Sequence, residues 1–267
     1  MTDVVFLRAW APLVAIFFLF FVPGRVDAQS VPGHRVTVGA NIGVHTGSTT
    51  RTDVAEFTTH REIGSVRGTQ TLGPSTVFDG SGSTLVWKRL GVGLSISHAG
   101  GKTTANVEAE VPHPFFFDFH RTATATAEDL EHRELIYHVS AQLAIPLGSS
   151  TRLTVLAGPS RFDASQDVVS GIETSEQGFP FDSVDIVASH VERLSVQSWG
   201  YHVGVDLAYH GLRKIGLLSR SALFDHVGVG VLVRYSRSRP SIELEGVEQP
   251  AFELGALHVV GGLRVGF

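Results

Sequence analysis

Apolar and polar residues alternate along most of this chain, and the C-terminal segment 257–267 shows the alternation most clearly. One phase holds Leu257, Val259, Leu263, Val265 and Phe267, and the other holds His258 and Arg264. A period of two is typical of a β-strand with one apolar face. The same pattern predicts eight strands, at about residues 34–45, 77–87, 91–111, 121–145, 152–170, 182–209, 226–238 and 252–267.

The N-terminal segment has the pattern of a secretory signal peptide. Residues 11–22 form an apolar run that is shorter than the roughly 20 residues a transmembrane helix needs. Pro23 and Gly24 follow, and Ala28 precedes Gln29 as a small-residue cleavage site. We expect residues 1–28 to be cleaved, with an uncleaved anchor as the alternative, and residues 29–267 to form one β-barrel domain that crosses a membrane with strands.

The connections between the predicted strands alternate in length. Short turns at 88–90 and 146–151 lie at one end, and the longer connections 46–76, 112–120, 171–181 and 239–251 lie at the other. The long link 211–225 breaks this rule. The pattern predicts an all-β fold: an eight-stranded antiparallel up-and-down transmembrane β-barrel with strands extending above the membrane. The connection 46–76 is either a plain loop or, through residues 57–72, an extra hairpin that would bring the number of strands to ten.

The Trp and Tyr residues of 29–267 all fall in the phase of the apolar face. Trp199 and Tyr209 bracket a segment close to the 9–11 or so residues that a tilted strand needs to cross a membrane. We therefore expect two aromatic girdles at the membrane surfaces. Their members are Trp87, Tyr137, Trp199, Tyr201, Tyr209, Tyr235 and Phe267.

The opposite phase is rich in glycine and holds a few large polar residues, as the narrow interior of an eight-stranded barrel requires. Charges there must be paired, and we expect Asp206 to pair with Arg234 or Arg264. A plug of salt bridges is the favoured interpretation, and a proton relay or gated pore is the alternative. The predicted polar network of the lumen comprises Asp206, Arg234, Arg264, His138, His202 and Gln142.

Composition narrows the function further. The chain has no cysteine and a net charge of −5, so neither disulfides nor a basic footprint for nucleic acid is expected. Its 13 histidines show no metal-ligand spacing such as HExxH, and we expect neither a metal nor a cofactor. Residues Ser189, His190 and Glu192, or His132 with its neighbouring glutamates, supply the residue types of a hydrolase without a recognisable motif, so we do not expect an enzyme.

Four predicted strands are longer than a membrane demands and carry an acidic excess. We expect residues 102–111, 121–135 and 182–198 to project as a sheet. One hairpin of that sheet ends in a Phe-rich loop, and exposed apolar patches usually mark a partner. The predicted partner-binding loop contains His113, Phe115, Phe116, Phe117 and Phe119.

The C-terminal strand resembles the closing strand of bacterial outer-membrane β-barrels, in which a final Phe after alternating apolar residues is the assembly signal. The PHPFFF segment is similar to a run in uncharacterised outer-membrane β-barrel domain proteins. The resemblance implies the outer membrane of a Gram-negative cell, contact with its lipid, and insertion by the barrel-insertion machinery through this strand. It also implies a structural or surface-interaction role with an unknown extracellular ligand; a small-solute pore or transporter and a lipid-modifying enzyme are the alternatives.

Overall fold

The computed structural model describes residues 35–210, 226–239, 242–244, 247–249 and 254–267. The predicted signal peptide and the 211–225 link lie outside the described residues. No helix in the described part of the chain is long and apolar enough to cross a membrane, a finding that does not bear on strands. The described strands are β1 (Val36–His45), β2 (Thr49–Thr59), β3 (Glu62–Leu72), β4 (Ser75–Trp87), β5 (Leu90–Pro112), β6 (His120–Pro146), β7 (Thr151–Glu176), β8 (Val184–Tyr209), β9 (Val227–Ser238), β10 (Ile242–Leu244), β11 (Val247–Gln249) and β12 (Leu257–Gly266).

Eight of these strands close into a ring, in the order β1-β4-β5-β6-β7-β8-β9-β12, and every pair in it is antiparallel. The first and last strands meet at the seam. There the Val36 N–H donates to the Phe267 carbonyl at 3.1 Å, and the Phe267 N–H donates to the Val36 carbonyl at 2.8 Å. The prediction of an eight-stranded antiparallel barrel is confirmed, and the remaining small sheet, β10-β11, lies within the connection between β9 and β12.

The 46–76 connection is a hairpin, β2-β3, rather than a plain loop. It does not enter the ring. Instead, β3 pairs with the distal part of β5, where Ser65–Gln70 lie opposite Ala105–Glu110. The ring therefore keeps eight strands, and the extra hairpin widens the projecting sheet.

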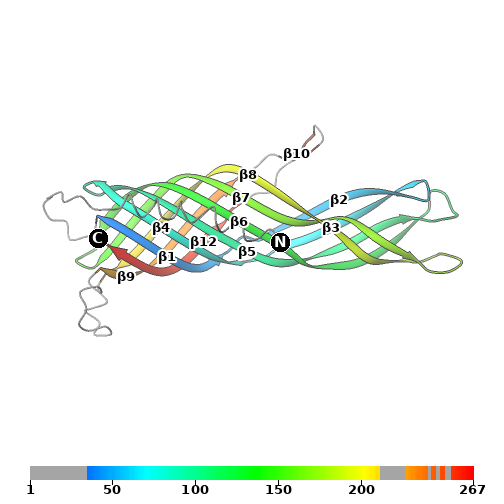
Figure 1. Ribbon diagram of the computed structural model, residues 1–267, viewed down its shortest axis with the longest axis horizontal. Helices are drawn as coiled ribbons and strands as arrows, with labels where there is room; N and C mark the ends of the chain where they lie inside the picture. The colour runs from blue at the N-terminus through cyan, green and yellow to red at the C-terminus, as the bar shows by residue number, and fades with distance from the viewer. Residues whose placement is uncertain (1–34, 211–225, 240–241, 245–246, 250–253) are drawn as a thin grey trace, which may run out of the picture.

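Beyond the ring, the long strands separate into two layers that we call the distal sandwich (residues 46–74, 102–135 and 163–197). Pairing between β6 and β7 begins only at His132 and Gln166, so β2-β3-β5-β6 and the β7-β8 ribbon face each other (Figure 1, right). Their inner faces bury a core that includes Val66, Ala105, Val107, Ala109, Val111, Ala123, Ala127, Leu130, Val169 and Val184. β7 reaches Glu176, past the predicted end of its strand.

The outer surface of the ring is an apolar band. Large side chains on it are exposed, including Ile42, Phe78, Leu94, Val139, Val203, Val231 and Leu263. The predicted girdle residues lie on this outer face: Trp87, Trp199, Tyr201, Tyr235 and Phe267 are exposed, and Tyr137 and Tyr209 are half-buried. A continuous apolar band of this kind is the surface with which a closed transmembrane barrel contacts lipid.

The phase of β4 changes along its length. Opposite β5 the register shifts between Leu85 and Trp87, which is a β-bulge. Trp87 is therefore exposed, while residues of the same numerical parity nearer the start of the strand, such as Asp79, are buried. A strict period of two anchored on Trp87 places Asp79 on the lipid side, and the bulge is the physical reason that it lies inside.

Candidate functional site

The centre of the lumen is built around a buried ion pair. The Arg234 guanidinium contacts the Asp79 carboxylate, and both side chains are almost completely buried. Arg234 also donates to Ser95 Oγ at 2.8 Å, and Asp79 accepts from Ser97 Oγ at 2.8 Å. A charge in this environment is tolerated because it has a charge partner and further hydrogen bonds; Arg234 Nε has no partner among the described residues.

A second ion pair lies toward the end of the barrel where the chain terminates. Arg264 donates through Nε to Asp206 Oδ2 at 3.2 Å. Asn41 joins the two pairs, because its side-chain oxygen accepts from Arg264 while its Nδ2 donates to Asp79 at 2.9 Å. Of the two partners predicted for Asp206, the structure places Arg264 beside it and Arg234 beside Asp79.

A histidine–serine chain extends this network. Ser160 Oγ lies 2.8 Å from Nδ1 of both His138 and His202, and His138 Nε2 lies 3.3 Å from Ser97 Oγ. The Ser97 hydroxyl donates its hydrogen bond to Asp79, so His138 Nε2 is the donor to Ser97 and His138 Nδ1 is an acceptor. Ser160 therefore donates to His138 and accepts from His202, which assigns one neutral tautomer to each imidazole.

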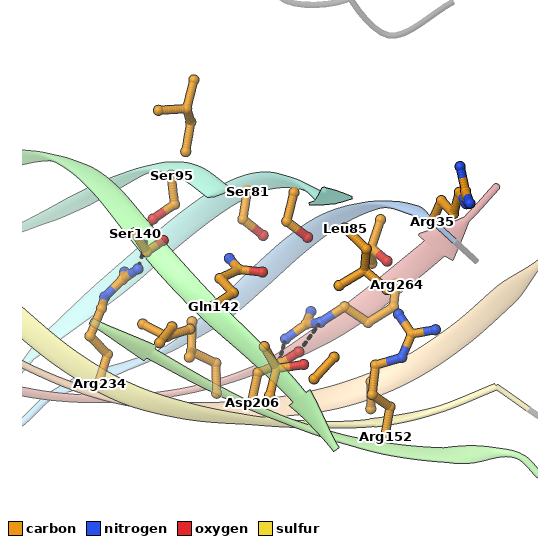
Figure 2. Close-up of a pocket in the computed structure, with 18 of the residues that line it drawn as sticks. Arg35, Ser81, Leu85, Ser95, Ser140, Gln142, Arg152, Asp206, Arg234 and Arg264 are labelled. Atoms are coloured by element: carbon orange, nitrogen blue, oxygen red, sulfur yellow. Dashed lines mark hydrogen bonds and ion pairs between the residues drawn. The ribbon is translucent and has the colours of Figure 1, made fainter. Parts of the chain in front are cut away.

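A polar cavity of about 60 Å³ occupies the lumen between Arg234 and the end of the barrel at which Phe267 lies. Figure 2 shows Arg234 at one end of it, Arg35 and Arg152 at the other, and Arg264 bonded to Asp206 between them. Gln142 also lines it. Gly93 faces this side chain, and a Cβ at Gly93 would stand 2.1 Å from Gln142 Nε2, so a larger residue there would displace the Gln142 amide.

On the other side of Arg234, side chains fill the barrel. Ile136, Phe162 and Leu254 form an apolar cluster whose members are essentially fully buried. Gly255 adopts a φ of +85°, and a Cβ there would lie 2.5 Å from the Ser236 carbonyl oxygen. Leu254 and Gly255, shortly before β12, thus pack into the mouth of the barrel, and together with the Arg234 network they obstruct the lumen.

A further polar cluster lies where the barrel meets the distal sandwich. It lines a cavity of about 40 Å³, and the ring centroids of His45 and His258 are 4.9 Å apart. Burial by itself raises the pKa of Glu134, but its hydrogen bond with His132 and the neighbouring imidazoles outweigh burial and hold the pKa below its ordinary value. Polar atoms without a hydrogen-bond partner in the described chain include His45 Nε2, His132 Nδ1, Glu134 Oε2, both ring nitrogens of His258 and both amide atoms of Gln166.

Such a cavity, lined by donors and acceptors, suits ordered water. In the described part of the chain, no three His, Asp or Glu side chains are arranged to hold a metal ion. The prediction that listed His138 and His202 as lumen residues did not include this cluster. The sequence gives little indication of this cluster. His45, Glu134 and His258 come from three different strands, and only the register of those strands brings them together.

Ion pairs brace the distal sandwich. Arg193 Nε donates to Asp167 at 2.8 Å, and this hydrogen bond lowers the pKa of Asp167. Arg121 is buried and donates to both carboxylate oxygens of Glu176, which lowers the pKa of Glu176 in the same way. The Arg121 pair ties the end of the β5-β6 hairpin to the end of β7.

The predicted partner-binding loop lies at the far end of the distal sandwich. Phe115, Phe116 and Phe117 are 69%, 62% and 85% exposed. The loop between β7 and β8 lies beside it, where the ring centroids of Phe115 and Phe181 are 5.4 Å apart and Phe179 is 87% exposed. His113 is buried, and its Nδ1 accepts the N–H groups of Phe115 and Phe116 at 3.1 and 3.2 Å. The sequence prediction missed the contribution of Phe179 and Phe181.

The residue types of a hydrolase are not assembled at Ser189. Ser189 and His190 are consecutive in β8 and therefore point to opposite faces of the strand. His190 instead lies 3.4 Å from Glu173 on the surface. His132 contacts Glu134 at 3.2 Å in the polar cluster where the barrel meets the distal sandwich. The histidine–serine chain at Ser160 is buried within the lumen, away from any macromolecular substrate.

No family model and no curated protein sequence matches the chain. Its fold is similar to those of solved bacterial surface proteins. Neisserial surface protein A is 13% identical, with a TM-score of 0.38 over 87% of this chain and 97% of that one. The attachment invasion locus protein of Yersinia pestis, solved with the heparin analogue sucrose octasulfate, is 12% identical, with a TM-score of 0.34 over 86% and 99%. The outer membrane protease OmpT of Escherichia coli is 11% identical, with a TM-score of 0.42 over 90% and 99%.

At these identities and TM-scores the likeness concerns the fold alone, and the assignment rests on the strands themselves. The ring is closed, its exterior is apolar between two sets of aromatic side chains, and its interior is polar and paired. With these three features on eight antiparallel strands, this chain has the architecture of the small outer-membrane β-barrel proteins.

Proposed function

We propose that this protein is a non-enzymatic outer-membrane β-barrel whose distal sandwich presents a contact surface outside the cell. One observation carries the proposal: the Phe-rich loops stand at the end of a braced two-layer extension. Large apolar side chains that stay exposed usually mark an interaction site. The obstructed lumen supports this role over that of a small-solute pore.

The proposed setting follows from the surface of the ring. Its apolar band contacts outer-membrane lipid, and the distal sandwich lies on the extracellular side. The seam strand β12 ends at Phe267 on the opposite side, in the periplasm. We propose that the barrel-insertion machinery recognises this strand, because it carries the terminal aromatic residue and supplies one side of the seam.

The test is adherence of cells that display the full chain. Adherence is measured to cultured cells, to matrix protein and to neighbouring bacteria, with display verified on unboiled gels. We expect the variant Phe116→Ser/Phe117→Ser/Phe179→Ser to lose adherence and the lumen variant Gln142→Ala to keep it. Adherence that is unaffected by the Phe substitutions contradicts the proposal, and stable stepwise conductance of the purified protein in planar bilayers favours the pore.

A further inference from the structure

We propose that the partner of the distal loops is a lipid bilayer with electrically neutral headgroups, into which the Phe side chains insert. The distal Phe surface consists of Phe115, Phe116, Phe117, Phe119, Phe179 and Phe181. This inference rests on the proposed function, since it names the class of partner for the same surface.

The rings are held outward before any partner arrives. Inside the first loop, the His113 N–H donates to the Phe119 carbonyl at 2.8 Å, and His113 Nδ1 accepts two further N–H groups. The Asp118 N–H donates to Glu62 on β3 at 3.1 Å, which ties the loop to a second hairpin. Because the backbone is fixed, insertion costs little ordering entropy.

The chemistry of the surface suits hydrocarbon better than a protein pocket. Its rings carry no hydrogen-bonding group, whereas protein hot spots are enriched in Trp, Tyr and Arg. The rings project from loop ends, and Phe117 and Phe179 are more than four-fifths exposed. A bilayer accepts projecting rings without a matching shape, and it gains from every ring removed from water.

Charge selects among the apolar partners. The distal sandwich carries 17 Asp and Glu residues against 7 Lys and Arg, a net charge of −10, although the whole chain carries only −5. This field repels an anionic bilayer and a second copy of the same sandwich. It leaves a neutral bilayer as the apolar partner that the surface can approach.

The experiment uses the full chain in nanodiscs and its co-flotation with phosphatidylcholine vesicles. We expect the native protein to float and Phe116→Ser/Phe117→Ser/Phe179→Ser to lose about a hundredfold or more in partitioning, since three exposed rings no longer enter hydrocarbon. The matched control, Val54→Ser/Val187→Ser/Val191→Ser, removes exposed apolar side chains elsewhere on the sandwich and is expected to float like the native protein.

Two further measurements separate the sources of an effect. Replacing part of the lipid with phosphatidylserine is expected to weaken flotation at low salt, and added salt to restore it. Failure of the native protein to float, or equal flotation of the Phe variant, overturns the bilayer as partner. If cell adherence still depends on the same Phe residues in that case, the proposed surface role stands and its partner is a protein; if adherence is also independent of them, both proposals fail.

Discussion

The barrel and the distal sandwich use the same strands in opposite ways. In the ring, β5 to β8 turn apolar side chains outward and polar side chains inward, toward the Arg234–Asp79 pair that β9 and β4 supply. In the distal sandwich the same strands bury small apolar residues such as Val107 and Ala123, and most of their charged side chains lie on the surface. The surrounding medium thus decides which face of a strand is apolar. The central ion pair of the lumen is fully buried, whereas the ion pairs of the sandwich range from the half-buried Arg121–Glu176 to the exposed Arg193–Glu131.

The largest expected effect comes from deleting Phe267, which disturbs closure of the barrel and leaves every residue of the distal sandwich in place. Two backbone hydrogen bonds at the seam disappear, together with the terminal aromatic ring. We expect the amount of folded protein at the cell surface to fall to a small fraction of normal, as measured by surface labelling and the heat-modifiable band. Phe267→Leu keeps the backbone bonds, so normal levels for that variant assign the effect to the seam. Normal levels for the deletion contradict the expectation.

The buried ion pair provides the next largest effect. Arg234→Ala leaves Asp79 buried without its charge partner, which costs about 3–5 kcal/mol. Urea unfolding in detergent, followed on unboiled gels, measures the loss. The double variant Asp79→Leu/Arg234→Met removes both charges and is expected to recover most of the stability. If the double variant is no better than the single one, the pair is not what fixes the lumen.

A cavity in the distal sandwich tests whether the two regions unfold separately. Leu130 is 2% exposed in the sandwich core, and Leu130→Ala is expected to cost about 2–5 kcal/mol locally. Hydrogen exchange of 102–131 is expected to accelerate while the heat-modifiable band of the barrel is unchanged. Accelerated exchange throughout the ring indicates that the two regions form one cooperative unit.

Acid is expected to loosen the sandwich before the barrel. The hydrogen bonds from Arg193 and Arg121 hold the pKa values of Asp167 and Glu176 below their ordinary values of 3.8 and 4.5. Ionised carboxylates therefore stabilise the fold at neutral pH, and this contribution declines below about pH 4 and is lost as the pH passes the lowered pKa values. Protease sensitivity of 163–197 reports the change. Equal sensitivity of Asp167→Asn/Glu176→Gln and the native protein at pH 7 contradicts it.

The smallest expected effect comes from an exposed ion pair. Arg193 bridges Asp167 and Glu131, but its side chain is 56% exposed. Arg193→Ala is therefore expected to cost about 0.2–1 kcal/mol, compared with the larger cost of Arg234→Ala in the lumen. Hydrogen exchange in β7 and β8 measures this cost. Equal costs for the two arginines contradict the view that depth of burial separates the regions.

The alternation of side chains predicted much of this fold. A strand with one face toward an apolar medium and the other toward a polar one places apolar residues at every second position, whether that medium is lipid or a protein core. The eight ring strands and the outward position of the aromatic residues follow from this alternation. Asp79 was not identified as a lumen residue from the sequence, because the bulge before Trp87 reverses the phase of β4. The contacts of Ser160 and Asn41 were not foreseen, since they depend on the register of strands far apart in sequence. Phe181 contacts Phe115 across the two loops because the β5-β6 and β7-β8 hairpins end at the same level.

The seam between β1 and β12 also orders the events of folding. Its pairs join the earliest described strand to the last one, the longest sequence separation in the ring, so the contact cannot form until the whole chain is available. The hairpins of the distal sandwich are local in sequence and can form early. We therefore expect the sandwich to cross the membrane while the sheet is still open. Pairing of β1 with β12 then closes the barrel as the final step.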